Sequence, residues 1–188
     1  CRADLAGHLR QHGYAVHLLD CLDRSNPELL KLQGLDSPRV RAYGVGKFFR
    51  QRIPKPEVLQ DIPRAYYRYG IPEEMFVRML NAVPEPDAIL ITSMMTYWYP
   101  GVFRAIELAK QRFPKVPVLL GGVYATLCAH HASTNSKADY VIQEPDPAQI
   151  IRCVDEITGY KCQNEFWRPR IFDTYPAFDV YEHLDYAC

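Results

Sequence analysis

The chain has 188 residues, with 22 basic and 22 acidic side chains and therefore a formal net charge of zero. This length predicts one domain, with room for an appendage but not for two full domains. Hydrophobic residues form 48% of the chain and charged residues 23%, which is typical of a globular protein and excludes a disordered one. Zero net charge argues against a dedicated nucleic-acid-binding protein, and no apolar run approaches the roughly 20 residues of a membrane span.

The cysteines occur singly, and their spacing matches neither a zinc site nor a CxxC pair. Isolated cysteines are usually small buried hydrophobic residues in a reducing compartment, so we expect a cytoplasmic protein. The adjacent pair His130-His131 cannot share a metal from one helix face, and we predict no metal site. The polar opening segment does not resemble a signal peptide, and the start without Met suggests a piece of a longer polypeptide.

The first part of the chain predicts two short elements and a long insertion. Apolar positions at helical spacing predict a helix over residues 4–13, which Gly13 ends. The apolar residues 15–20 predict a short buried strand. Residues 21–72 contain several prolines and glycines, which break long elements, so they predict an insertion of short helices and turns.

Helices and strands alternate in the remainder of the chain. Apolar runs predict strands over residues 87–93, 116–120 and 138–142. Amphipathic spacing and start signals predict helices over residues 73–83, 100–112, 125–132 and 147–158. From Gly159 onward the sequence is aromatic and irregular, which is typical of a linker or docking arm.

This alternation predicts an α/β fold with a doubly wound parallel sheet, flavodoxin-like or Rossmann-like. A doubly wound domain normally begins with a strand, whereas this chain begins with a predicted helix. We therefore expect the first strand to be missing, which would leave a gap in the sheet or an edge that borrows a partner.

Three groups of residues follow predicted strands and so should share the carboxyl edge of the sheet, where open parallel sheets bind ligands. They are residues 93–101, 121–126 and 143–145. Gly121 and Gly122 would let a ligand approach the backbone, and Ser93 and Thr96 offer hydroxyls. The sulfur-containing and aromatic side chains beside them suit a large, flat, partly apolar ligand. These side chains are Met94, Met95, Tyr97, Trp98 and Tyr99.

Other interpretations of this edge remain open. A Gly-Gly pair after a strand is often only a tight turn, and an aromatic run is often only core. The sequence has neither GxGxxG after a strand nor GxxxxGK[ST], which disfavours a dinucleotide site and excludes a phosphate-loop hydrolase. No arrangement of catalytic side chains follows from spacing, so we predict no self-contained active site.

A family resemblance is carried by residues 87–132, which read DAILITSMMTYWYPGVFRAIELAKQRFPKVPVLLGGVYATLCAHHA. This stretch resembles the cobalamin-binding domain that precedes the catalytic barrel in cobalamin-dependent radical S-adenosylmethionine (SAM) proteins. TYPAFDVYEHLDYAC, residues 174–188, resembles the link into that barrel. Three further segments are similar to the same family: HLRQHGYAVHLLDCLDR (8–24), GVGKFFRQRIPKPE (44–57) and ADYVIQEPDP (138–147).

The resemblance assigns roles to the sheet edge. Ser93-Met94-Met95 is similar to the family's SxL signature, and Gly121-Gly122 matches its GG signature. It implies that Ser93 contacts the nucleotide tail of cobalamin, that the two glycines make room for that tail, and that residues 94–99 face the corrin ring. Glu144 resembles the acidic turn of the family and is expected to bond backbone amides of a neighbouring loop. The candidate cofactor-binding residues are Ser93, Met94, Met95, Thr96, Tyr97, Trp98, Gly121, Gly122, Tyr124, Thr126 and Glu144.

The family's third signature, DxHxxG, whose His ligates cobalt from below, is absent from this sequence. Many radical members of the family lack it and hold cobalamin with the tail detached and no His ligand. The absence leaves the lower axial position open. It also favours an alternative, a degenerate domain that has lost the cofactor and only docks the barrel.

The resemblance also implies what the rest of the polypeptide contains. Residues 1–158 would form the cobalamin-binding domain, with the insertion at 21–72, and residues 159–188 would lead to a radical SAM barrel. The CxxxCxxC motif for its 4Fe–4S cluster is absent here, so cluster and SAM would be bound beyond Cys188, in a reaction such as methyl transfer. A stand-alone flavin or nucleotide binder is disfavoured because no phosphate-binding loop is visible.

One charged stretch stays unassigned. No acidic residue lies between Asp36 and Glu57, while the basic residues there are Arg39, Arg41, Lys47, Arg50, Arg52 and Lys55. Such a run is usually a solvated face. It could also dock anionic parts of a cofactor or the missing barrel.

Overall fold

The computed structural model describes residues 2–40, 46–144, 146–160 and 175–183. Its centre is a three-stranded parallel sheet with the order β3-β4-β5. The strands are β3 (Ile89–Ser93), β4 (Val118–Gly122) and β5 (Tyr140–Val141). Each of the three strands predicted from residue 87 onward is therefore confirmed; β3 and β5 are shorter than predicted, and β4 begins and ends two residues later.

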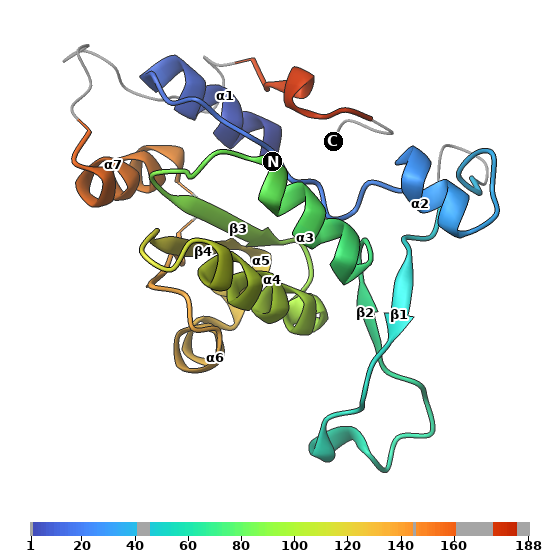
Figure 1. Cartoon of the computed structure of the whole chain (residues 1–188). Coiled ribbons are helices and arrows are strands. Elements are labelled where there is room, and N and C mark those ends of the chain that lie inside the picture. Colours follow the sequence, from blue (N-terminus) through green and yellow to red (C-terminus); the bar gives the residue numbers. More distant parts are fainter. Residues whose placement is uncertain (1, 41–45, 145, 161–174, 184–188) are drawn as a thin grey trace.

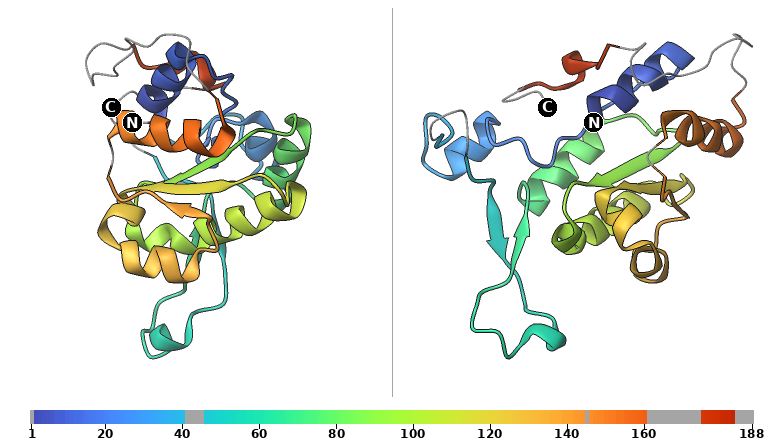
Figure 2. Two further views of the ribbon diagram at one scale, coloured as in Figure 1. Left: turned by 90° about the vertical axis from the view of Figure 1, so that its left-hand side faces the viewer. Right: turned by 180° about the vertical axis from the view of Figure 1, so that it is seen from behind.

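Helices cover both faces of this sheet (Figures 1 and 2). On one face lie α4 (Tyr99–Arg112), α5 (Val123–Leu127) and α6 (Ala129–Asn135). On the other lie α1 (Arg2–His12) and α7 (Pro147–Thr158), while α3 (Glu73–Ala82) packs along α4. Two helical layers around a parallel sheet are the doubly wound arrangement that the alternation predicts.

The main core lies between the sheet and the α4–α5 layer. Ile106 of α4, Leu120 of β4 and Ala125 of α5 are fully buried in one cluster. A second cluster joins Leu80 of α3 to Phe113 at the end of α4. Burial of these apolar side chains supplies the main stabilisation, about 25 cal/mol per Å² removed from water.

Polar contacts join the two helices of the opposite face. His12 Nε2 lies 2.8 Å from Asp155 Oδ2, and the Tyr14 hydroxyl donates to Asp155 Oδ1 at 2.6 Å. Burial raises the pKa of Tyr14, and the hydrogen bond to Asp155 adds to this effect. The 3-10 helix η4 (Phe178–Val180) packs on α1, where Arg10 pairs with Asp179 at 2.6 Å.

The insertion contains an antiparallel hairpin that the sequence did not predict. Its strands are β1 (Arg50–Arg52) and β2 (Tyr67–Tyr69), and the segment between them carries the 3-10 helix η2 (Glu57–Leu59). The short helix α2 (Pro27–Leu32) precedes the hairpin, with Asn26 capping its first turn. Figures 1 and 2 show the hairpin projecting away from the sheet.

Two predictions for local structure are wrong. Residues 15–20 form no strand, because no described residue forms a ladder with them and an apolar segment needs a hydrogen-bonded neighbour to become one. Residues 125–132 belong to two helices rather than one, since the chain leaves helical geometry at Cys128 (φ −124°, ψ 40°).

Some predictions from the sequence concern residues outside the described ranges. Cys1, Cys162, Cys188, Pro145 and most of the predicted linker lie outside the described residues. The described cysteines, Cys21, Cys128 and Cys153, are half-buried. In the part of the chain that is described, each helix is too short or too polar to cross a membrane, and no cluster of potential metal ligands occurs.

Candidate functional site

The carboxyl ends of β3 and β4 lie side by side. Ser93 is paired with Gly122 in the parallel register, so both strands end at the same level. The chain continues from β3 into the 3-10 helix η3 (Thr96–Trp98) and from β4 into α5. The segments 94–98 and 123–127 therefore meet at one edge of the sheet, as the sequence predicts.

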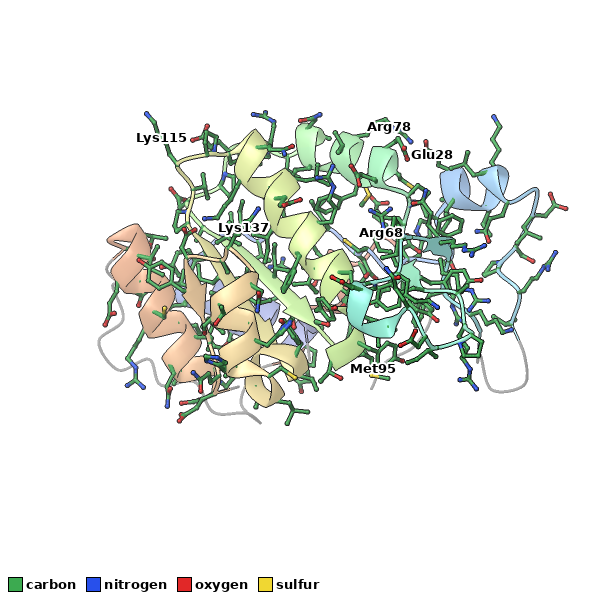
Figure 3. The ribbon with its side chains drawn as sticks, turned by 90° about the horizontal axis from the view of Figure 1, so that it is seen from below. Glu28, Arg68, Arg78, Met95, Lys115 and Lys137 are labelled. Atoms are coloured by element: carbon green, nitrogen blue, oxygen red, sulfur yellow. The ribbon has the colours of Figure 1, made fainter. Side chains whose placement is uncertain are left out.

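Exposed apolar side chains gather at this edge. Met94, Met95 and Tyr97 follow β3, and Val123 and Leu127 follow β4. They are between 41% and 70% exposed, although each is large and hydrophobic. Figure 3 shows Met95 at the outer surface of the molecule. We call these five residues the apolar rim; exposed apolar groups of this kind mark binding surfaces.

Ser93 shapes the start of the rim. Its side chain is buried, and the hydroxyl donates to the carbonyl oxygen of Met95 at 2.8 Å. This hydrogen bond closes a tight turn directly after β3. The turn exposes Met94 and Met95, so Ser93 orders the loop that carries them.

The two glycines differ in their surroundings. Gly122 has φ +85°, and a Cβ there would lie 2.2 Å from Thr92 Oγ1 and 2.8 Å from the Ser93 carbonyl oxygen. A Cβ on Gly121 would meet nothing within 4 Å. Since side chains alternate along a strand, Gly121 faces away from the core face of Leu120, toward the α1–α7 layer. Gly122 is thus required by the fold, whereas Gly121 borders open space.

Trp98 joins the rim to the hairpin. Its ring stacks on Tyr69 with centroids 5.7 Å apart and meets Phe48 edge to face at 5.8 Å. Its Nε1 atom is buried and has no hydrogen-bond partner among the described residues. Thr96, at the start of η3, is half-buried. Trp98 therefore anchors the loop of residues 94–98 on Tyr69 and Phe48, while Tyr97 remains exposed.

The remaining candidate residues lie below or beside the rim. Tyr124 is buried, its hydroxyl lies 2.7 Å from His131 Nδ1, and burial raises its pKa to about 12. Thr126 Oγ1 donates to the Gln143 carbonyl oxygen at 2.8 Å, which ties α5 to the segment after β5. Glu144 accepts a hydrogen bond from the Gln149 side-chain amide at 2.8 Å. These three residues order the loops around the edge.

The structure thus brings most of the predicted residues together but divides their roles. Met94, Met95 and Tyr97 present surface, Gly121 borders open space, and the others hold the loops in place. Leu127 was missed because it lies inside the helix predicted over residues 125–132, whereas Val123 lies in the predicted edge segment 121–126 but was not among the candidate residues. Their position directly after Gly121-Gly122 was the available signal.

Two cavities lie away from the rim. The larger, about 540 Å³, is within the hairpin, between residues 52–55 and 63–66. The smaller, about 320 Å³, lies at the opposite end of the sheet, where Tyr14 and Tyr160 line it. The rim itself is an open surface and suits a broad, flat ligand better than a compact one.

The central part of the chain is similar to a known protein family. Residues 64–150 match the family model described as B12 binding domain. This range contains the whole parallel sheet, the apolar rim and every candidate binding residue. No curated protein and no solved structure gives a significant match. The match supports a cobalamin-binding domain with a Rossmann-like fold.

Proposed function

We propose that the B12-binding domain of this chain holds cobalamin on the apolar rim and presents it to a radical SAM barrel of the same polypeptide. The observation that carries the proposal is the exposed apolar rim at the carboxyl edge of a sheet that matches the B12-binding family. In this proposal residues 1–158 form the binding domain and residues 159–188 lead to the barrel.

The residues at the edge fit a corrin ring in shape and chemistry. Met94, Met95 and Tyr97 on one side and Val123 and Leu127 on the other form a broad apolar surface. Methionine side chains adapt to an irregular ligand, and an aromatic ring packs against a flat one. Covering these side chains would remove apolar area from water, which favours binding.

The open space beside Gly121 fits the nucleotide tail. Its Cβ position is clear of every neighbour within 4 Å, so a ligand can approach the backbone of β4 there. Ser93 pairs with Gly122, so its side chain lies on the opposite face of the sheet from the open space at Gly121. In this proposal Gly121 makes room for the tail, Ser93 orders the loop at the start of the rim, and the rim holds the ring.

The rim offers no axial ligand to cobalt. Residues 94–98 and 123–127 include no His, Cys, Asp or Glu. Bound cobalamin supplies a cobalt centre that can carry a methyl group. The chain's own contribution would be to orient the ring, exclude water from its buried face and leave the lower cobalt position without a protein nitrogen. We therefore expect the base-off spectrum.

The radical SAM partner rests on the resemblance of residues 174–188 to the link into the barrel. A 4Fe–4S cluster, SAM and a methyl-transfer reaction belong to that barrel and not to this chain. The proposal requires a CxxxCxxC segment downstream of Cys188. Sequencing of the downstream reading frame tests this part, and a stop codon there would exclude it.

The test of binding is a cobalamin titration followed by visible absorbance. The wild-type chain should retain a base-off spectrum through desalting. Gly121→Leu should fold normally and lose binding, because its side chain fills the open space. Ala82→Leu is the matched control, since it adds a similar side chain at an exposed end of α3. Equal binding by both variants would reject this site, and no binding by the wild type would favour a docking domain without cofactor.

A further inference from the structure

A basic cavity lies in the hairpin, away from the apolar rim. Its volume is about 540 Å³, which is within the range of small-molecule sites, about 300–1,000 Å³. Both arms of the hairpin contribute to it, and the hairpin projects from the body of the molecule (Figure 1). The lining residues are Arg52, Ile53, Pro54, Lys55, Pro63, Arg64, Ala65 and Tyr66.

Positive charge in this cavity is not neutralised by the protein. Arg52 and Arg64 are exposed, and neither pairs with a carboxylate among the described residues. The Lys55 ammonium donates to the carbonyl oxygens of Ile62 and Gln60, which hold it in place but carry no charge. The acidic residues of the loop do not line the cavity; they are Glu57 and Asp61. Three cations around one cavity form an anion site.

The wall of the cavity provides a flat aromatic surface. The Tyr66 side chain lines the cavity and is half-buried. Burial is the main cause that raises the pKa of Tyr66, and the neighbouring Tyr99 adds to this effect. Pro54 and Pro63 restrict the backbone on either side, so the wall is ordered before a ligand arrives.

We propose that this cavity binds a small phosphorylated ligand with a flat ring, a nucleoside phosphate. The planar guanidinium groups of Arg52 and Arg64 match phosphate oxygens in bidentate geometry. The ring of Tyr66 provides a stacking surface for the base. None of these residues belongs to the apolar rim, so the proposal stands independently of cobalamin binding.

The test is a titration of the full chain with ADP, with pyrophosphate and adenosine as separate probes. Isothermal calorimetry gives the affinity, and backbone amide shifts locate the site. ADP should bind more tightly than either part, with shifts centred on residues 52–55 and 63–66. The double variant Arg52→Gln/Arg64→Gln should weaken ADP binding at least about tenfold, because two charge-assisted contacts are lost.

The matched control is Lys115→Gln/Arg152→Gln, which removes the same charge from exposed positions outside the cavity. Figure 3 shows Lys115 across the molecule from Met95. Equal weakening in both double variants would indicate a general charge effect and overturn the site. Absence of ADP binding, amide shifts centred elsewhere, or equal affinity for pyrophosphate and ADP would also overturn the proposal. The wild-type shifts decide the question even if a variant fails to fold.

Discussion

The indole ring of Trp98 stacks on the phenol ring of Tyr69, with centroids 5.7 Å apart and planes inclined by 27°. Trp98 belongs to the loop that carries the apolar rim, and Tyr69 ends the second strand of the hairpin. The insertion and the candidate site are therefore one packed unit. A change in this contact should affect the hairpin before it affects the sheet.

Trp98→Leu tests this coupling. The variant loses three ring contacts, with Phe48, Tyr69 and Tyr97, and we expect a loss of about 1–2 kcal/mol in the free energy of unfolding. Trypsin should cleave the hairpin faster, after Arg52 or Arg64. Trp98→Phe should restore most of the resistance, because it keeps an aromatic ring and removes a buried N–H that has no described partner. Tyr97→Leu removes only the edge-to-face contact of Tyr97 with Trp98 at 6.0 Å and leaves the contacts of Trp98 with Phe48 and Tyr69, so it should change cleavage much less. Equal cleavage of the Trp98 and Tyr97 variants would contradict the coupling.

The adjacent glycines predict opposite responses to the same substitution. Gly122→Ala should destabilise the fold by about 2 kcal/mol or more, because alanine is strained at positive φ and its Cβ overlaps β3. Gly121→Ala should change stability by less than about 0.5 kcal/mol, since its Cβ enters open space. Urea unfolding measures both. Equal stability of the two variants would show that the register of β3 and β4 differs from the one described.

The ion pairs of Glu73 should make the stability of the fold depend on pH in the acid range. Glu73 accepts hydrogen bonds from Arg104 of α4 and Arg68 of β2, so it ties α3 to both elements. The bond from Arg104 is the main cause that lowers the pKa of Glu73 from its ordinary value of 4.5, against the effect of burial. A lowered carboxyl pKa stabilises the fold above the ordinary value, and this stabilisation is lost as pH falls through the folded-state value.

Glu73→Gln should therefore lower the free energy of unfolding by about 1 kcal/mol near pH 6 and by much less near pH 3. The measurement is the urea midpoint of wild type and variant at both values. Glu74→Gln is the control, since Glu74 is exposed and makes no ion pair among the described residues. A pH-independent difference for Glu73→Gln would show that its ion pairs do not stabilise the fold.

Local patterns were sufficient to predict the helices and strands from residue 73 onward. Apolar runs and helical spacing act over a few residues, and there the predicted and observed elements agree, except that residues 125–132 belong to two helices. The hairpin was missed because Arg50–Arg52 is polar throughout and each strand has only three residues. The pairing of the two strands also depends on contacts far apart in sequence. The strand prediction for residues 15–20 was wrong for the opposite reason. The apolar pattern of a strand was present, but no described strand pairs with these residues.

The candidate site was predicted in position but not in detail. Parallel strands end at one edge, so Ser93 and Gly121 could be placed together from the sequence alone. The different roles of Gly121 and Gly122 could not be predicted, because they depend on a backbone angle and on the distance to Thr92 and Ser93. The burial of Tyr124 also depends on α6, which supplies its partner His131.

The contact between α1 and α7 has a consequence for synthesis on the ribosome. His12 and Arg10 of α1 are synthesised long before Asp155 and Asp179, with which they pair in the folded protein. At translation rates of roughly 5–20 residues per second, this delay is on the order of ten to thirty seconds. During that time the apolar side of α1 has no final neighbour. We expect nascent chains that stop before Asp155 to bind chaperones through α1, and chains that extend past Asp179 to release them.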